Sequence, residues 1–141
     1  MRLITAFLIL MTAGLFGEER DQMTATANVA KEWVELVDNG NYSKSWEVAS
    51  PRLQLTMPKA EWDRLMQAMR APLGSVSSRE IALQRPAQNP QGLAPGDYMI
   101  IVYQTQFANR AQALPELVTL SLGYDGKWHV LTYLIKDDTK N

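Results

Sequence analysis

Two arginines flank a short serine-rich turn in the stretch RAPLGSVSSRE, residues 70–80. Cations beside serine hydroxyls could bind an anion, because both groups donate hydrogen bonds. Their positions favour a structural role instead. Arg70 falls at the expected C-terminus of a helix, where a cation complements the negative end of the helix dipole and an anion would meet carbonyl oxygens. We therefore interpret Arg70 as a helix cap and Arg79 as a salt-bridge or loop-anchoring residue, with an anion or partner site as the alternative.

The single histidine, His129, is the other side chain that could take part in catalysis. It falls on an expected strand, where it shares a face with Tyr133. A catalytic histidine needs a carboxylate or a hydroxyl within reach, and only an analogy of shape offers Asp97, Tyr98 or Tyr103 as that partner. We therefore expect a packed or half-exposed histidine rather than a catalytic one.

The chain has few residues of the types that bind metals or cofactors. The chain has no cysteine and one histidine, and it has no spaced carboxylate cluster of the kind that holds zinc or calcium. It also contains no phosphate-binding glycine loop, nucleophile elbow or paired carboxylate motif. We predict no catalytic residue, no metal and no cofactor.

Charge and length narrow the class of protein further. The 141 residues suit one domain, and 15 acidic against 14 basic residues give a net charge of -1. A nucleic-acid binder would show a basic face, and a membrane-surface domain would show a polybasic segment. We therefore expect no nucleic acid as a partner, and an unknown small ligand or envelope protein instead.

The first 17 residues, MRLITAFLILMTAGLFG, differ from the rest of the chain. Arg2 precedes an uncharged, mostly apolar stretch that is shorter than the roughly 20 residues of a membrane-spanning helix. Such a stretch is typical of a secretory signal peptide. We predict a periplasmic or secreted protein without stable membrane insertion after cleavage; an uncleaved anchor and a cytoplasmic segment are the alternatives. The predicted division is a signal peptide at 1–17, a loose linker at 18–24, a single domain at 25–136 and a frayed tail at 137–141.

Helical spacing dominates the first half of that domain. Apolar residues at Ala30, Trp33, Val34 and Val37 predict an amphipathic helix, which Asn39-Gly40 ends. A second short helix is expected from Asn41 to Ser50-Pro51, and a third from about Thr56 or Met57. The buried stripe of this third helix should consist of Trp62, Leu65, Met66 and Met69.

After Gly74 the hydrophobic period changes to two. Strands are predicted at 78–84, 97–107, 116–124 and 127–136. The stretch 85–96 holds three prolines and two glycines, which predicts a loop, and Asp125-Gly126 predicts a tight hairpin. Because helices precede strands that are joined by short connections, we predict an α+β fold with N-terminal helices packed on a curved four-stranded antiparallel sheet.

Two ordered strings of residues resemble one bacterial family. The first is Trp33, Asp38, Gly40, Tyr42, Trp46, Trp62, the run 70–74 and Arg79; the second is Gly96, Tyr98, Thr105, Phe107, Glu116, Asp125-Gly126, Trp128 and Tyr133. Over about residues 27–136 they resemble the small exported bacterial proteins grouped as domain of unknown function four thousand and nineteen. One departure is Thr132, where the resemblance implies a glycine. The order of elements is also similar to cystatin-like and NTF2-like architecture, an analogy of shape that does not fix function.

The residues leave two functions from different classes open. The favoured hypothesis is a non-enzymatic, exported cell-envelope domain that binds a small ligand or a protein partner on a concave sheet framed by helices. The residues expected to contact that ligand or partner are Arg70, Arg79, Tyr98, Tyr103, His129 and Tyr133. The alternative is a small enzyme whose site lies in the same concavity and uses His129 with an acid.

Two strands carry apolar residues on both faces, at 98–107 and 128–135. A sheet that is wet on one face alternates apolar and polar residues instead, and three short helices need not cover both faces. A large exposed apolar patch usually marks an interaction surface. We therefore predict that the second face is used, by a homodimer as the narrow preference or by a ligand or partner in the concavity.

Overall fold

Four antiparallel strands form a single sheet in the order β1-β2-β3-β4 in the computed structural model, which describes residues 2–138 and the side chains of residues 14–138. The strands are β1 (Val76–Gln88), β2 (Asp97–Phe107), β3 (Leu114–Leu122) and β4 (Trp128–Ile135). The helices precede them as α1 (Arg2–Asp38), α2 (Tyr42–Glu47), α3 (Pro51–Thr56) and α4 (Lys59–Arg70), with a 3-10 turn at Ala71–Leu73. This order confirms the predicted α+β fold with N-terminal helices and a four-stranded antiparallel sheet.

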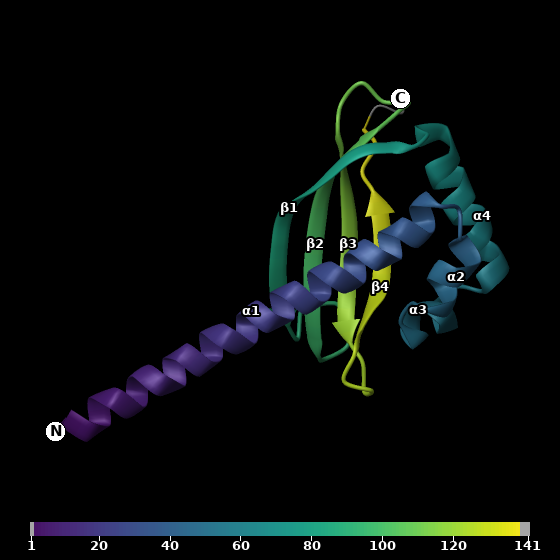
Figure 1. Cartoon of the computed structure of the whole chain (residues 1–141). Coiled ribbons are helices and arrows are strands. Elements are labelled where there is room, and N and C mark those ends of the chain that lie inside the picture. Colours follow the sequence, from purple (N-terminus) through teal and green to yellow (C-terminus); the bar gives the residue numbers. More distant parts are fainter. Residues whose placement is uncertain (1, 139–141) are drawn as a thin grey trace.

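Helix α1 crosses one face of the sheet with its C-terminal half, and its N-terminal half extends away from the domain (Figure 1). Residues 14–22 are exposed, whereas the four apolar residues at helical spacing, Ala30, Trp33, Val34 and Val37, are buried as predicted. The backbone of residues 18–24 is helical, which differs from the loose linker expected there. These residues are mostly good helix formers, and the helix is already held to the sheet where Gln84 Nε2 donates to the Met23 carbonyl at 2.7 Å.

The short helices α2, α3 and α4 are held together by indole hydrogen bonds. Trp33 Nε1 donates to the Ser45 carbonyl at 2.9 Å, Trp62 Nε1 donates to Ser45 Oγ at 3.0 Å, and Trp46 Nε1 donates to the Met57 carbonyl at 2.8 Å. Each of these buried or partly buried indoles thus finds an acceptor for its N–H. The tryptophans therefore join three helices that are each too short to be stable alone.

Helix α3 was not predicted, and α4 begins later than predicted. Ser50-Pro51 not only ends the preceding turn but also starts α3, with Ser50 as the cap and Pro51 in the first turn. Helix α4 begins at Lys59, with Pro58 as its N-cap, rather than at Thr56 or Met57. Its predicted stripe is partly wrong, because Leu65 is exposed while Trp62 and Met66 are buried.

The strands confirm the predicted order but differ at their ends. Strand β1 continues to Gln88 through Pro86, inside the stretch predicted as a loop. This is possible because β1 lies at the edge of the sheet, where a missing N–H breaks no ladder. The turn between β3 and β4 spans residues 123–127, with Gly126 at φ 74 and no positive φ at Asp125. A longer loop that needs one left-handed glycine thus replaces the expected two-residue turn.

The hydrophobic core lies between the helices and one face of the sheet. Inward side chains of the strands include Met99, Ile101, Phe107, Leu114, Val118, Leu120, Val130 and Ile135. Helix residues such as Trp33, Trp62 and Met66 pack against them. We call this side of the sheet the covered face and the opposite side the open face. Among the residues described, none of the helices is long and apolar enough to cross a membrane.

Candidate functional site

Four charged side chains from four elements meet at the edge of the core, and we call them the arginine network. They are Asp38 at the end of α1, Arg70 at the end of α4, Arg79 on β1 and Glu116 on β3. Asp38 accepts from Arg79 Nη1 at 2.7 Å and from Arg70 Nη2 at 2.9 Å. Glu116 accepts from Arg79 Nε at 2.7 Å. Two cations thus face two carboxylates, and the network has no net charge.

Glu116 is completely buried and depends on these donors. Thr105 Oγ1 donates to it at 2.9 Å, and the Tyr133 hydroxyl donates to its other oxygen. Arg70 Nη1 lies 4.0 Å from that same oxygen. A buried carboxylate without such partners would cost several kcal/mol, so the network explains how a charge can stand in the core.

The pKa shifts in the network follow from burial and pairing. Burial raises the pKa of Asp38, but the hydrogen bonds and charges of Arg79 and Arg70 outweigh it and hold that pKa below its ordinary value of 3.8. Burial and the neighbouring Glu116 carboxylate raise the pKa of the Tyr133 hydroxyl well above its ordinary value of 10.0. At neutral pH the Asp38 carboxylate is therefore ionised and the Tyr133 phenol is neutral.

The two arginines of the serine-rich turn are both engaged inside the protein. Arg79 makes the salt bridges expected of it, to Asp38 and Glu116. Arg70 does more than cap α4, because its side chain is only 5% exposed and reaches Asp38. Its Nε is buried without a hydrogen-bond partner among the described residues. The guanidinium groups are thus committed to carboxylates, which leaves little of their charge for an external anion.

A groove lies beside this network, between α1 and strands β1 and β2, and we call it the α1–β1 groove. Its volume is about 320 Å³, and its lining consists of Ala27, Asn28, Lys31, Val34, Glu35, Arg79, Ile81 and Tyr103. Tyr103 is 4% exposed, and its hydroxyl has no hydrogen-bond partner among the residues described. The Arg79 guanidinium lies over the Tyr103 ring, 5.7 Å from its centroid.

Tyr103 carries the polar chemistry of this groove. Burial raises the pKa of its hydroxyl to about 12; the Arg79 charge lowers it and Glu116 raises it further. The hydroxyl is therefore neutral at physiological pH and can donate a hydrogen bond. Most buried polar groups are paired, so an unpaired phenol beside a cavity needs an explanation.

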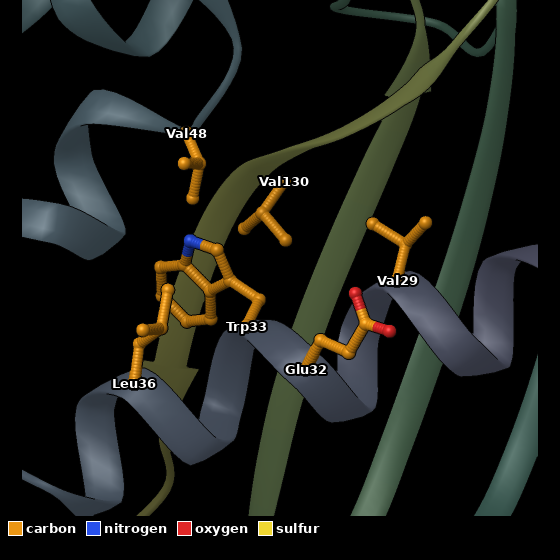
Figure 2. A pocket seen from close by; sticks show the side chains of 6 residues that line it. All are labelled: Val29, Glu32, Trp33, Leu36, Val48 and Val130. Atoms are coloured by element: carbon orange, nitrogen blue, oxygen red, sulfur yellow. The ribbon is translucent and has the colours of Figure 1, made fainter.

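A second pocket lies on the other side of α1 and is almost wholly apolar. Figure 2 shows Trp33 and Leu36 on α1 facing Val48, with Val130 of β4 behind them and Glu32 at the side. Its volume is about 310 Å³. The Trp33 indole N–H is already bonded to the Ser45 carbonyl. This Trp33 pocket can exclude water, but apart from Glu32 it offers few groups that would orient a ligand.

The structure brings some of the expected site residues together and separates others. Arg70 and Arg79 belong to the arginine network, Tyr133 donates to its Glu116, and Tyr103 lies beside its Arg79. Tyr98 is buried at the start of β2, where its hydroxyl accepts from Arg52 Nη1 at 2.8 Å and donates to the Ala94 carbonyl at 2.5 Å. His129 pairs with Asp125 in the exposed turn, at 2.8 Å between Nε2 and Oδ2.

Asp38, Glu116 and Thr105 were not predicted as site residues. Glu116 carries a readable signal, because it stands in phase with Leu114, Val118 and Leu120 on the face that enters the core. A charged residue at such a position must have a partner. No comparable signal identifies that partner, since Asp38 and Arg79 come from distant parts of the chain. Within residues 2–138 no three histidine, cysteine, aspartate or glutamate side chains are placed to hold a metal ion.

These features first define a class of protein: an α+β domain with helices on one face of a four-stranded antiparallel sheet and a neutral ion network between them. The chain belongs to the family described as "Protein of unknown function (DUF4019)", whose model matches residues 29–133. This match confirms the family that the two strings of residues resemble. No curated protein and no solved structure matches the chain. The function must therefore be argued from the site itself.

Proposed function

We propose that the protein is an exported, non-enzymatic binding domain of the cell envelope, and that the α1–β1 groove holds its ligand. The ligand would be a small, neutral, largely apolar molecule with one hydrogen-bond acceptor. The observation that carries the proposal is the Tyr103 hydroxyl, which is buried beside the groove without a partner among the described residues. An unpaired buried hydroxyl costs about 1–3 kcal/mol, and a ligand acceptor would recover that cost.

The charges around the groove favour a neutral ligand. Arg79 already faces Asp38 and Glu116, and the exposed side chains of Lys31 and Glu35 line the groove with opposite charges. A ligand of either charge would therefore be attracted by one of these two side chains and repelled by the other. The apolar lining of Ala27, Val34 and Ile81 suits a hydrocarbon or aromatic body, and about 320 Å³ lies at the small end of ligand sites.

Catalysis is less well supported than binding. His129 lies in none of the cavities described above, and its ring contacts the Asp125 carboxylate in an exposed turn. Asp38 and Glu116, which both pair with the lining residue Arg79, are engaged in salt bridges, and this pairing lowers the pKa of Asp38 and makes it a poor proton acceptor. Glu35 lines the groove as an exposed carboxylate. A site that donates one hydrogen bond and excludes water can hold a molecule without changing it.

Export is supported by the placement of the N-terminal segment. Residues 14–22 of α1 are exposed and make no part of the core. Small residues that could precede a cleavage site stand at Ala13, Gly14 and Gly17, and cleavage after any of them would leave the buried stripe of α1 in place.

Fluorescence titration with prodan, a neutral naphthalene that carries one ketone, tests the binding proposal. We expect saturable binding with a blue-shifted emission, because the probe leaves water for an apolar groove. Ala27→Leu should fill the groove and abolish this binding, whereas the matched change Val48→Phe in the Trp33 pocket should preserve it. Tyr103→Phe should weaken binding roughly fivefold, the equivalent of one hydrogen bond of about 1 kcal/mol. No saturable binding, or a loss with Val48→Phe and not with Ala27→Leu, would contradict the proposal.

A further inference from the structure

An apolar row crosses all four strands on the open face of the sheet. Leu83 pairs with Val102, Val102 with Leu117, and Leu117 with Leu134. Leu83 and Leu134 are 45% and 55% exposed, and Val102 and Leu117 are half-buried. None of the four belongs to the hydrophobic core. We call these four residues the open-face row.

The row exists because β1 changes phase between Ile81 and Leu83, at the second of its two register shifts. The register against β2 shifts between Ile81 and Leu83, so Ile81 lines the α1–β1 groove and Leu83 reaches the open face. Without this bulge the alternation of β1 would place a different set of residues outward. The open-face row therefore results from the register shift in β1 and involves more than one exposed leucine.

Opposite charges stand at equal distances on the two sides of this row. Glu80 pairs with Gln104, two residues beyond Val102, and Arg85 pairs with Ile100, two residues before it. Both charged residues are exposed, and neither takes part in an ion pair among the described residues. The charge pattern of β1 is therefore acidic on one side of the row and basic on the other.

We propose that the open face binds a second copy of this chain, with a two-fold axis lying along the open-face row. A rotation about that axis exchanges the two sides of the row. Glu80 of one copy then faces Arg85 of the partner subunit, and this happens twice because the contact is symmetric. The same rotation lays the two apolar rows against each other, which is how face-to-face sheets bury their side chains.

The size of the face predicts a weak dimer. Four strands about 4.8 Å apart and three rows about 6.7 Å apart give a contact of roughly 20 by 20 Å. Stable interfaces bury about 800 Å² on each partner, and this patch of roughly 400 Å² is about half that size. We therefore expect a dissociation constant on the order of 10 µM.

Charge reversal gives a test that is independent of the groove. Sedimentation equilibrium of the full chain, below and above about 10 µM, should show a monomer–dimer equilibrium. Glu80→Arg and Arg85→Glu should each weaken association at least about tenfold, because each homodimer then places like charges together. Glu61→Arg on the exposed side of α4 is the matched control and should change nothing.

Mixing the two charge variants supplies the decisive result. In a mixed dimer the Glu80→Arg chain meets the Arg85→Glu chain, and both contacts become attractive again. The mixture should recover association to within a few fold of the unchanged protein, with circular dichroism confirming that each variant is folded. A protein that stays monomeric across the series, or a mixture that associates no better than its components, would overturn the proposal. If the apolar N-terminal segment drove association, then Glu80→Arg, Arg85→Glu and Glu61→Arg would all leave the dissociation constant unchanged. That result would also overturn the proposal.

Discussion

Tyr103→Phe is expected to make the protein more stable, against the usual effect of changing a buried residue. The substitution removes one oxygen atom, and that atom has no hydrogen-bond partner among the described residues. The ring remains, so the packing of Tyr103 in the core and its contact with the Arg79 guanidinium at 5.7 Å are kept. Only the cost of burying an unpaired hydroxyl changes.

The size of this effect follows from opposing contributions. Removing an unsatisfied hydroxyl recovers about 1–3 kcal/mol, and the small space left by the oxygen costs part of it. A net gain of about 1 kcal/mol remains, which corresponds to a rise in melting temperature of about 4 °C for a domain of this size. Most substitutions destabilise by about that amount, so the sign of the change is diagnostic.

Tyr133→Phe is the matched control, because it removes the same atom from a paired tyrosine. The Tyr133 hydroxyl donates to Glu116 and lies 3.4 Å from Arg70 Nη1. Its loss should leave Glu116 with one donor fewer and destabilise the protein by about 1–3 kcal/mol. Urea unfolding followed by tryptophan fluorescence measures both variants. If Tyr103→Phe destabilises as much as Tyr133→Phe, then the Tyr103 hydroxyl is satisfied in the free protein and the argument for the groove fails.

Further expectations concern the network, pH and the N-terminus. Arg79→Ala should reduce the free energy of unfolding by about 3–5 kcal/mol, because it leaves Glu116 buried with too few partners; a loss under about 1 kcal/mol in chemical denaturation would refute this. Since the pKa of Asp38 is lower in the folded than in the unfolded chain, its stabilisation is complete above its ordinary value of 3.8 and is lost as the pH falls below it, which acid titration of the melting temperature measures. Since the pKa of Tyr103 is raised from 10.0 to about 12, stability should fall as the pH rises above 10.0, and Tyr103→Phe should reduce that fall; an unchanged alkaline profile would speak against the shift. Mass spectrometry of the protein from its native cells should find an N-terminus between residues 14 and 20, and an intact Met1 in the mature pool would contradict export with cleavage.

The elements that local patterns specify were largely predictable from the sequence. The spacing of Trp33, Val34 and Val37 fixes the buried side of α1, and the change of period after Gly74 marks the start of the sheet. Errors arose where one residue type serves two purposes. Ser50-Pro51 was interpreted as a helix end although the same pair starts a helix, and Pro86 was interpreted as a loop residue although an edge strand accepts it.

The site was harder to predict than the fold, because its geometry depends on contacts between distant segments. A salt bridge of Arg79 was predictable from the sequence, but its partners Asp38 and Glu116 were not. The sequence also does not predict that the Tyr103 hydroxyl lacks a hydrogen-bond partner. A tyrosine on the core-facing side of a strand usually finds an acceptor. Such properties follow from what surrounds a side chain and not from its neighbours along the chain.

The register shift in β1 also bears on how this family can vary in length. Arg79 and Ile81 face the helices and Leu83 belongs to the open-face row, so one edge strand serves both sides of the sheet. Inserting or deleting a single residue between Arg79 and Leu83 would exchange the two sets, uncoupling Arg79 from Glu116 or turning Leu83 inward. The connection at 89–96 is exposed over most of its length. Its side chains do not alternate between the two faces of the sheet, so a change in its length exchanges no residues between them. Insertions and deletions among relatives should therefore accumulate in that connection, while the spacing within β1 stays constant.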